Sequence, residues 1–282
     1  MFTWPRRSNP QTITHILKTT ILIKEYYSMR SLFTPAILAL SIGLLTTACE
    51  NDPASPATPS GKVVNGAAVT VGGGTATPYV QLDAAGKPTA YGVRLTDGAL
   101  SNLPQDAPGY EYTLPMPAEA AATGIDHVSL DYNPDGHEPE GIYDHEHYDV
   151  HFYYVSPSQR DSIALGPDLV PVDAKYIPKD YKTFDNFSIP RMGVHYIDTT
   201  ANELHGHHFD KTFIYGFTKG TLAFLEPMIT LEFLKTKPNF TASVKQPQQW
   251  QRTGISYPGK YSVRYDAATK STVIEMHDLV KK

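Results

Sequence analysis

Apolar and polar side chains alternate with a period of two along much of the chain after residue 62, as in β-strands that bury one face. In residues 79–83 and 91–95 this alternation runs on both sides of a turn that contains AAG. Residues 261–265 and 271–276 repeat the arrangement around DAATK. Both ends of the predicted domain are therefore expected to be antiparallel hairpins.

Proline-rich connections separate the predicted hairpins and exclude long helices, because proline lacks an amide donor and breaks a helix. These connections cover residues 103–117 and 165–181. Only AEAAA, residues 118–122, and SQRDSIA, residues 158–164, favour short helices. With 18 Tyr and 11 Phe in the chain, the pattern predicts a mainly β fold, an antiparallel β-barrel or sandwich with long Pro-rich loops and one or two short helices.

The segment YDHEHYDVHFYYV, residues 143–155, combines a strand pattern with a high density of imidazole. Successive side chains of a strand point to opposite faces, so Tyr148, Val150 and Phe152 are expected to face the core. The other face would carry the polar members of the segment: His145, His147, Asp149 and His151.

The spacing of these polar residues limits what they can bind together. Residues two apart on a strand have Cα atoms about 7 Å apart and can reach one ion, whereas residues four apart are near the limit for two imidazoles. One metal could take His147 with Asp149, Asp149 with His151, or His145 with His147. Alternatively, Asp149 would orient one ring through its N–H. A hydrogen-bonded polar network or a pH-sensitive interface would account for the histidines without a metal.

Further ligand types follow downstream. His195 lies in a predicted short strand, and Glu226 lies among apolar neighbours in a second predicted strand that ends at Pro227. A carboxylate in such surroundings is almost never left unpaired, so Glu226 requires a cation or a histidine. Glu203 and the HGHH of residues 205–208 are weaker candidates, because a polar loop tolerates such residues without using them. Imidazole and carboxylate donors suit a divalent transition metal, namely Zn, Fe, Mn, Ni or Cu, without selecting among these.

A second metal motif is DYNPDG, residues 131–136, which matches the start of a calcium loop. Asp131, Asn133 and Asp135 fall at its first three ligand positions. The twelfth position is Ile142, where the loop needs a bidentate glutamate. This argues against calcium and favours a β-turn.

The first part of the chain has the pattern of an export signal. Residues 29–48 contain one arginine and an apolar stretch too short and too rich in small residues for a membrane span, and they end before Cys49, the only cysteine. We therefore predict that residues 1–28 are an upstream extension from a misassigned start and that residues 29–48 are a lipoprotein-type signal peptide. Residues 49–61 would contain the lipidated Cys49 and a flexible tether, and residues 62–282 would form a single β-rich domain. The expected location is extracytoplasmic, as a lipoprotein of the bacterial cell envelope or a secreted protein.

Charge and missing motifs exclude several function classes. The chain has 24 basic and 29 acidic residues. The first 48 residues contain five of the basic residues and one of the acidic residues. The remainder of the chain therefore has 19 basic and 28 acidic residues and a net charge of −9. Such a chain without a Lys/Arg block is a poor partner for nucleic acid or an anionic membrane surface, and membrane contact would come through the lipid anchor only. The sequence contains neither a phosphate-binding Gly-Lys-Ser/Thr loop nor a G-x-S-x-G elbow.

Three blocks of the sequence carry a family resemblance: GHEPEGIYDHEHYDVHFYYV, PRMGVHY and TFIYGFTKGTLAFLEPMIT. They match the patterns G-H-x-P-x-G-x-Y, H-x-D-x-H-F-Y, M-G-x-H, and F-I-Y-G with E-P-M. These patterns resemble a family of bacterial extracytoplasmic proteins of unknown function, whose named member is a thermophile protein under extracytoplasmic-stress sigma-factor control. The resemblance implies a predominantly β fold, self-association into a homo-oligomeric ring and no established activity. His145 and HGHH lie outside the pattern.

Together these observations predict one polar cavity that binds a divalent transition metal. Its expected ligands are His147, Asp149, His151, His195 and Glu226, and its expected orienting side chains are His137, Tyr143 and His145. If the protein is an enzyme, we expect a metal-bound water or oxygen species to act on a small organic substrate, with Asp149 or His137 as proton carrier. The competing prediction is a non-catalytic β-barrel that binds an apolar ligand, or a structural ring in the envelope, with the histidines as a polar network.

Overall fold

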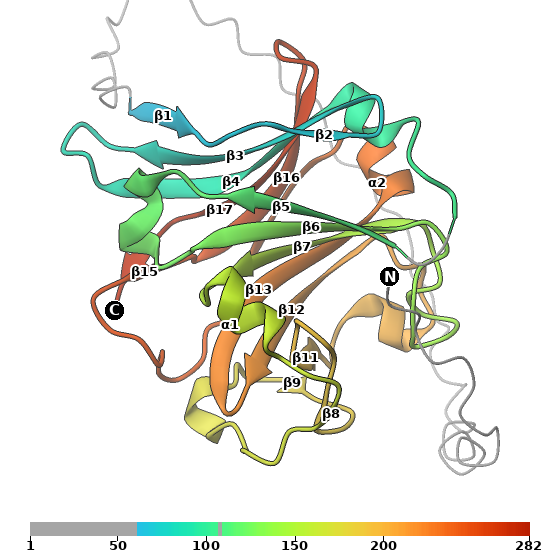
Figure 1. Cartoon of the computed structure of the whole chain (residues 1–282), viewed down its shortest axis with the longest axis vertical. Helices are drawn as coiled ribbons and strands as arrows, with labels where there is room; N and C mark the ends of the chain where they lie inside the picture. Colours follow the sequence, from blue (N-terminus) through green and yellow to red (C-terminus); the bar gives the residue numbers. More distant parts are fainter. Residues whose placement is uncertain (1–60, 107–108) are drawn as a thin grey trace, which may run out of the picture. The chain divides into compact units, whose positions relative to one another are not determined.

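Two antiparallel sheets make up most of the computed structural model, which describes residues 61–106 and 109–282 (Figure 1). The predicted signal peptide, Cys49 and the tether up to residue 60 lie outside the described residues. Sheet A has the strand order β1-β3-β4-β17-β16-β14, and β2 also pairs with β3. Its strands are β1 (Lys62–Asn65), β2 (Val69–Val71), β3 (Gly74–Leu82), β4 (Pro88–Thr96), β14 (Asn239–Ser243), β16 (Lys260–Asp266) and β17 (Ser271–His277).

Sheet B has the order β5-β6-β7-β13-β12-β11-β9. Its strands are β5 (Tyr110–Pro115), β6 (His127–Asn133), β7 (His147–Tyr153), β9 (Tyr181–Lys182), β11 (Val194–Asp198), β12 (Lys211–Thr218) and β13 (Thr221–Thr230). Two small ribbons pair β8 (Gly166–Pro167) with β10 (Phe187–Ser188) and β15 (Ser256–Tyr257) with β18 (Val280–Lys281). The helices are α1 (Pro157–Asp161), α2 (Leu231–Lys235), and the 3₁₀ turns η1 (Asp97–Leu100), η2 (Ala118–Thr123), η3 (Ala174–Tyr176) and η4 (Asn202–His205).

The main hydrophobic core lies between the two sheets. Val80 and Tyr91 of sheet A and Val150 and Phe152 of sheet B belong to one buried cluster. The rings of Tyr91 and Phe152 meet across it with centroids 5.4 Å apart. This arrangement confirms the predicted sandwich. The barrel alternative is wrong for the described residues, because sheet B ends at β5 and β9 without closing on itself.

The predicted local elements are largely confirmed. Hairpins form between β3 and β4 and between β16 and β17, with Val80 opposite Tyr91 and Val263 opposite Ile274. AEAAA forms η2, and the second predicted helix is α1, where Ser156 completes a capping box. The pattern did not predict α2, which follows directly on β13.

Two strand boundaries differ from the sequence interpretation. β7 begins at His147, so His145 lies in the preceding loop and does not share the face of Asp149 and His151. β13 does not end near Pro227 but continues to Thr230. Proline cannot donate to a ladder, and the pairing with β7 is interrupted between Leu225 and Met228. Among the described residues no helix is both long and apolar enough to span a membrane.

Candidate functional site

A buried row of polar side chains runs along the face of sheet B that points away from the sandwich core. β7 contributes His147, Asp149 and His151, because alternate residues of a strand share a face. All three are buried. They are flanked by two small apolar clusters built around Tyr143, Ile197, Phe209, Ile214 and Met228, and around Tyr153, Ala223 and Phe224. The polar row is therefore largely shielded from water.

The first group in this row joins β7 to the loop before it and consists of His137, His147 and Asp149. Nε2 of His147 lies 3.0 Å from Oδ1 of Asp149, and Nε2 of His137 lies 3.4 Å from Oδ2. Ligand atoms that share one tetrahedral ion are about 3.4 Å apart, since each is about 2 Å from the metal. The two contacts with Asp149 are close to this spacing, and the three ligand atoms lie within 4.8 Å of one another.

Backbone carbonyl groups determine which ring nitrogens face Asp149. Nδ1 of His147 lies 2.6 Å from the carbonyl oxygen of His145, and Nδ1 of His137 lies 2.7 Å from that of Glu138. A carbonyl can only accept, so each Nδ1 donates its proton, and in a neutral ring Nε2 then presents a lone pair. Metal-bound histidines are typically held in this way through their second nitrogen.

The second group consists of His151, His195 and Glu226, which come from β7, β11 and β13. Nε2 of His151 lies 3.4 Å from Oε1 of Glu226, and Nε2 of His195 lies 3.8 Å from Oε2. On the other side of the ring, Nδ1 of His151 lies 2.9 Å from Oδ2 of Asp131. The hydroxyl of Ser129 donates to Oδ1 of Asp131 at 2.8 Å. Asp131 thus orients His151 as a carboxylate orients a metal-binding histidine.

His195 reaches Glu226 across β12, where Gly216 lies at the crossing point. Gly216 pairs with His195 on one side and with Phe224 on the other. A Cβ at position 216 would come within 2.1 Å of the Phe224 ring, so this ring lies over the glycine. The ring also contacts those of His151 and His195, with centroids 4.6 and 5.5 Å away. Phe224 therefore supports the second group from one side.

Four buried atoms of the two groups lack a hydrogen-bond partner among the described residues. They are Oδ1 of Asp149, Nδ1 and Nε2 of His151, and Oε2 of Glu226. Their neighbours are close but outside hydrogen-bond geometry. An unsatisfied buried polar group destabilises a fold by about 1–3 kcal/mol, and native proteins rarely leave one. A cation shared within each group would satisfy Oδ1 of Asp149, Nε2 of His151 and Oε2 of Glu226, whereas Nδ1 of His151 faces Asp131 on the other side of the ring.

Carboxylates crowd the row and alter the pKa values of the histidines. Asp131 lies directly opposite Asp149, and like charges repel in this position. Burial lowers the pKa of His151, but the negative charges of Glu226 and Asp131 outweigh it and raise this pKa to about 9. His137 behaves in the same way, because Asp149 outweighs burial and raises its pKa to about 9.

The other members of the second group are shifted toward their neutral forms. Burial, followed by the charge of Asp149, raises the pKa of Glu226 to about 8. Burial, followed by the charge of His151, lowers the pKa of His195 to about 3. At neutral pH the metal-free second group therefore holds at least one titratable proton between His151 and Glu226, while His195 keeps a lone pair available.

Each group has one ligand that touches solvent. The side chains of His137 and His195 are 22% and 25% exposed, whereas their partners are buried. An ion could therefore approach each group from the surface through its exposed imidazole.

The five ligands predicted to line one cavity are divided between these two groups. His137, which we expected to orient a ligand, lies at ligand distance in the first group. His145 contacts the site through its backbone carbonyl, and its side chain is exposed. The ring of Tyr143 packs against His137 with centroids 6.0 Å apart, and its hydroxyl donates to Glu203 at 3.5 Å.

Residues of the rejected calcium motif belong to the polar row. Asn133 donates to Oδ2 of Asp149 at 2.8 Å, and Asp131 contacts His151. Sequence reasoning missed these roles. The signal was the alternation in HVSLDYN, residues 127–133, which puts His127, Ser129, Asp131 and Asn133 on one face of β6.

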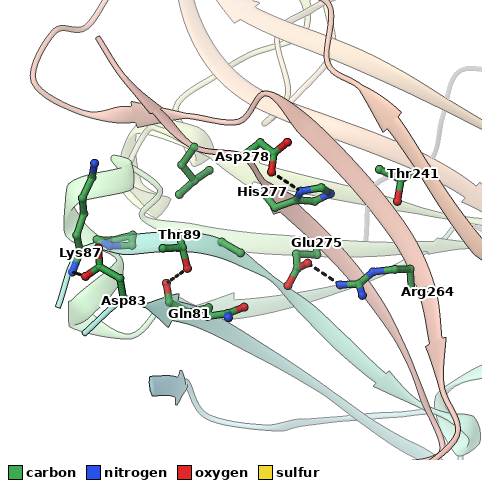
Figure 2. A pocket seen from close by; sticks show the side chains of 12 residues that line it. Gln81, Asp83, Lys87, Thr89, Thr241, Arg264, Glu275, His277 and Asp278 are labelled. Carbon is green, nitrogen blue, oxygen red and sulfur yellow. Dashed lines mark hydrogen bonds and ion pairs between the residues drawn. The ribbon is translucent and has the colours of Figure 1, made fainter. Parts of the chain in front are cut away.

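A second polar surface lies on the outer face of sheet A, around a cavity of ≈600 Å³ (Figure 2). There Glu275 accepts from the Tyr79 hydroxyl at 2.6 Å and from the Arg264 guanidinium at 2.7 Å. The Tyr79 side chain extends over Gly92 of the intervening strand to reach Glu275. His195 extends over Gly216 in the same way to reach Glu226. Figure 2 marks the contact of Glu275 with Arg264 and that of His277 with Asp278, so these charged side chains are paired within the protein.

Comparison with known proteins gives a limited family match. Residues 83–132 match the family model described as TTHB210-like, hypothetical protein TTHB210. This segment runs from the β3–β4 turn to β6, so it includes Ser129 and Asp131 but ends before the three blocks on which the sequence resemblance rests. The chain is thus similar to an uncharacterised family over these residues. Neither the curated proteins nor the solved structures gave a match.

Proposed function

We propose that this protein binds divalent transition metal ions at the two groups on the outer face of sheet B. The supporting observation is that each group brings two imidazole nitrogens and a carboxylate oxygen within 4.8 Å of one another. Such mixed donors suit Zn, Fe, Mn, Ni or Cu better than calcium or magnesium, which prefer oxygen ligands.

Within this proposal the residues of the row have separate tasks. His137, His147 and Asp149 hold one ion, and His151, His195 and Glu226 hold the other. Asp131 and the carbonyl oxygens of residues 138 and 145 orient the rings. A bound ion of this class would supply Lewis acidity or, for Fe, Mn or Cu, redox chemistry. The apolar clusters beside the row limit the access of water.

The alternative is a metal-free polar network in a structural or ligand-binding protein. The raised pKa values of His137 and His151 favour it, because an imidazolium next to Asp149 or Glu226 would offset the buried negative charge. In that case the histidines stabilise the fold without binding an ion.

Elemental analysis separates the two functions. The full chain would be purified without a histidine tag, incubated with Zn²⁺, Fe²⁺, Mn²⁺, Ni²⁺ or Cu²⁺ in turn, and dialysed before metal is counted. We expect up to two ions per chain, with one lost in His147→Gln and one lost in Glu226→Gln. Substoichiometric metal with every ion would contradict metal binding and favour the polar network.

A matched control is available in His205→Gln. His205 is exposed and its Nε2 faces the carbonyl of Thr199 at 3.0 Å, away from both groups. This variant loses one imidazole, as His147→Gln does, but should keep the metal content of the unmodified protein. A similar loss in both variants would mean that the metal is bound nonspecifically by exposed histidines.

We also propose that the protein is exported and lipidated on Cys49. The support is the apolar stretch followed by small residues and a single cysteine. Membrane fractionation and intact mass of the wild type and Cys49→Ser test this proposal. We expect the wild type to lose everything before Cys49 and to gain a diacylglyceryl group, and the variant to move to the soluble fraction. A membrane-bound variant would rule out the lipid anchor.

A further inference from the structure

Two exposed histidines meet on the surface next to the His137–His147–Asp149 group. His145 lies in the loop before β7, and His208 lies in the loop between η4 and β12. Their side chains are 44% and 48% exposed, and their ring centroids are 4.8 Å apart. The sequence places these residues 63 positions apart, so only the fold brings them together.

The geometry of this pair suits a shared ion. An imidazole bound through one nitrogen has its centroid about 3.2 Å from the metal, so two rings at a tetrahedral angle have centroids about 5 Å apart. The His137–His147 pair of the first group has the same centroid separation, 4.8 Å, and a similar edge-to-face orientation. The surface pair therefore repeats the ring spacing of the inner pair.

Carboxylates complete the surroundings of the surface pair. Oε2 of Glu232, on α2, lies 3.4 Å from Nε2 of His208. Asp210 lies 3.9 Å from the same nitrogen, and Asp144 lies 3.9 Å from Nε2 of His145. Two lysines lie close to these carboxylates in the sequence: Lys235 pairs with Glu146, and Lys211 follows Asp210 and lies over the rings of Phe233 and Phe240. Negative charge at an exposed imidazole pair raises the local concentration of a divalent cation.

The segments that carry the surface pair also build the first group. The carbonyl of His145 accepts the Nδ1 proton of His147. Phe209, which follows His208, packs against the ring of His147 with centroids 5.5 Å apart. An ion held by the surface pair would thus lie next to the walls of the buried group.

We propose that His145 and His208, with the carboxylate of Glu232 beside His208, form a surface site that captures a divalent transition metal ion and passes it to His137, His147 and Asp149. The transfer rests on the proposed function, whereas the surface site does not. A site that captures and transfers an ion must bind it weakly and exchange it rapidly. The side chains of His145, His208 and Glu232 are all exposed, so a bound ion can dissociate without any rearrangement of the fold.

Calorimetric titration with Zn²⁺ tests the surface site. The full-length wild type is compared with His145→Gln/His208→Gln and with the control His205→Gln/His207→Gln, which removes two other exposed histidines of the same region. We expect the first variant to lose one exchangeable site, or to bind it at least tenfold more weakly, and the control to titrate like the wild type. Identical titrations of all three proteins would overturn the surface site.

Uptake kinetics test the transfer. Substoichiometric Zn²⁺ is released from a weak chromogenic chelator, and the rate at which the protein removes it is followed by stopped flow. We expect His145→Gln/His208→Gln to take up Zn²⁺ at least fivefold more slowly than the control and to reach the same final amount. Equal rates would overturn the transfer. If the wild type retains none of the five ions after dialysis, both the transfer and the proposed function fail, while the titration still decides the surface site.

Discussion

Gly216 on β12 lies opposite Phe224 on β13, and the phenyl ring occupies the volume that a side chain at position 216 would need. This relationship lets His195 extend over β12 toward Glu226 and supports the ring of His151. The second group therefore depends on a residue that has no side chain.

Gly216→Ala should lower the free energy of unfolding by about 1–3 kcal/mol, because the new methyl group must displace the Phe224 ring in a packed region. Urea unfolding measures this change. In a Phe224→Leu background the smaller side chain leaves room, so Gly216→Ala should cost less than half as much. An equal penalty in both backgrounds would mean that Phe224 is not the cause.

Metal uptake by the second group should release protons below about pH 8. The pKa values of His151 and Glu226 are raised to about 9 and about 8, so the pair holds at least one titratable proton at pH 7 that an incoming ion must displace. Affinity should therefore rise with pH and level off above about pH 9. Calorimetry of Zn²⁺ binding in two buffers of different ionisation enthalpy measures the release, with Glu226→Gln as the control. Equal apparent enthalpies in the two buffers at pH 7 would contradict it.

His127 should make the protein less stable as the pH falls through 6.5. Burial is the largest cause that lowers the pKa of His127 below 6.5. The positive charge of the Arg160 guanidinium, which lies 3.2 Å from Nε2 of His127, lowers this pKa further. Below pH 6.5 the unfolded chain therefore binds a proton that the folded protein resists, which favours unfolding. Urea unfolding of the wild type and His127→Gln at pH 8 and pH 5.5 isolates this contribution. The wild type should lose more stability than the variant, and a parallel loss would show that other groups are responsible.

Glu275→Ala should destabilise the outer face of sheet A by about 1–3 kcal/mol, because the buried Tyr79 hydroxyl loses its acceptor. Asp278→Asn removes an exposed charge of the same surface (Figure 2) and keeps a residue type that tolerates the positive φ of this position, so it should change stability by less than about 0.5 kcal/mol. Thermal unfolding compares the two variants. Adding Tyr79→Phe to Glu275→Ala should recover part of the loss, and no recovery would mean that the hydroxyl is satisfied in another way.

The sequence was sufficient to place the two terminal hairpins and β7, and to assign the two faces of β7. Alternation depends only on local backbone geometry, so residues 148, 150 and 152 could be assigned to the core and residues 147, 149 and 151 to the opposite face without any tertiary information. The same reasoning applied to β6 would have added Asp131 and Asn133.

Tertiary structure decided how these residues are grouped. The order β7-β13-β12-β11 and its register place Glu226 between His151 and His195, and no local pattern specifies which strands become neighbours or how they align. The conformation of the loop before β7 determined two further contacts. This loop folds back to bring His137 to Asp149, and it places His145 against His208. Alternation thus determined the faces, and nonlocal pairing and loop packing determined which side chains on them meet.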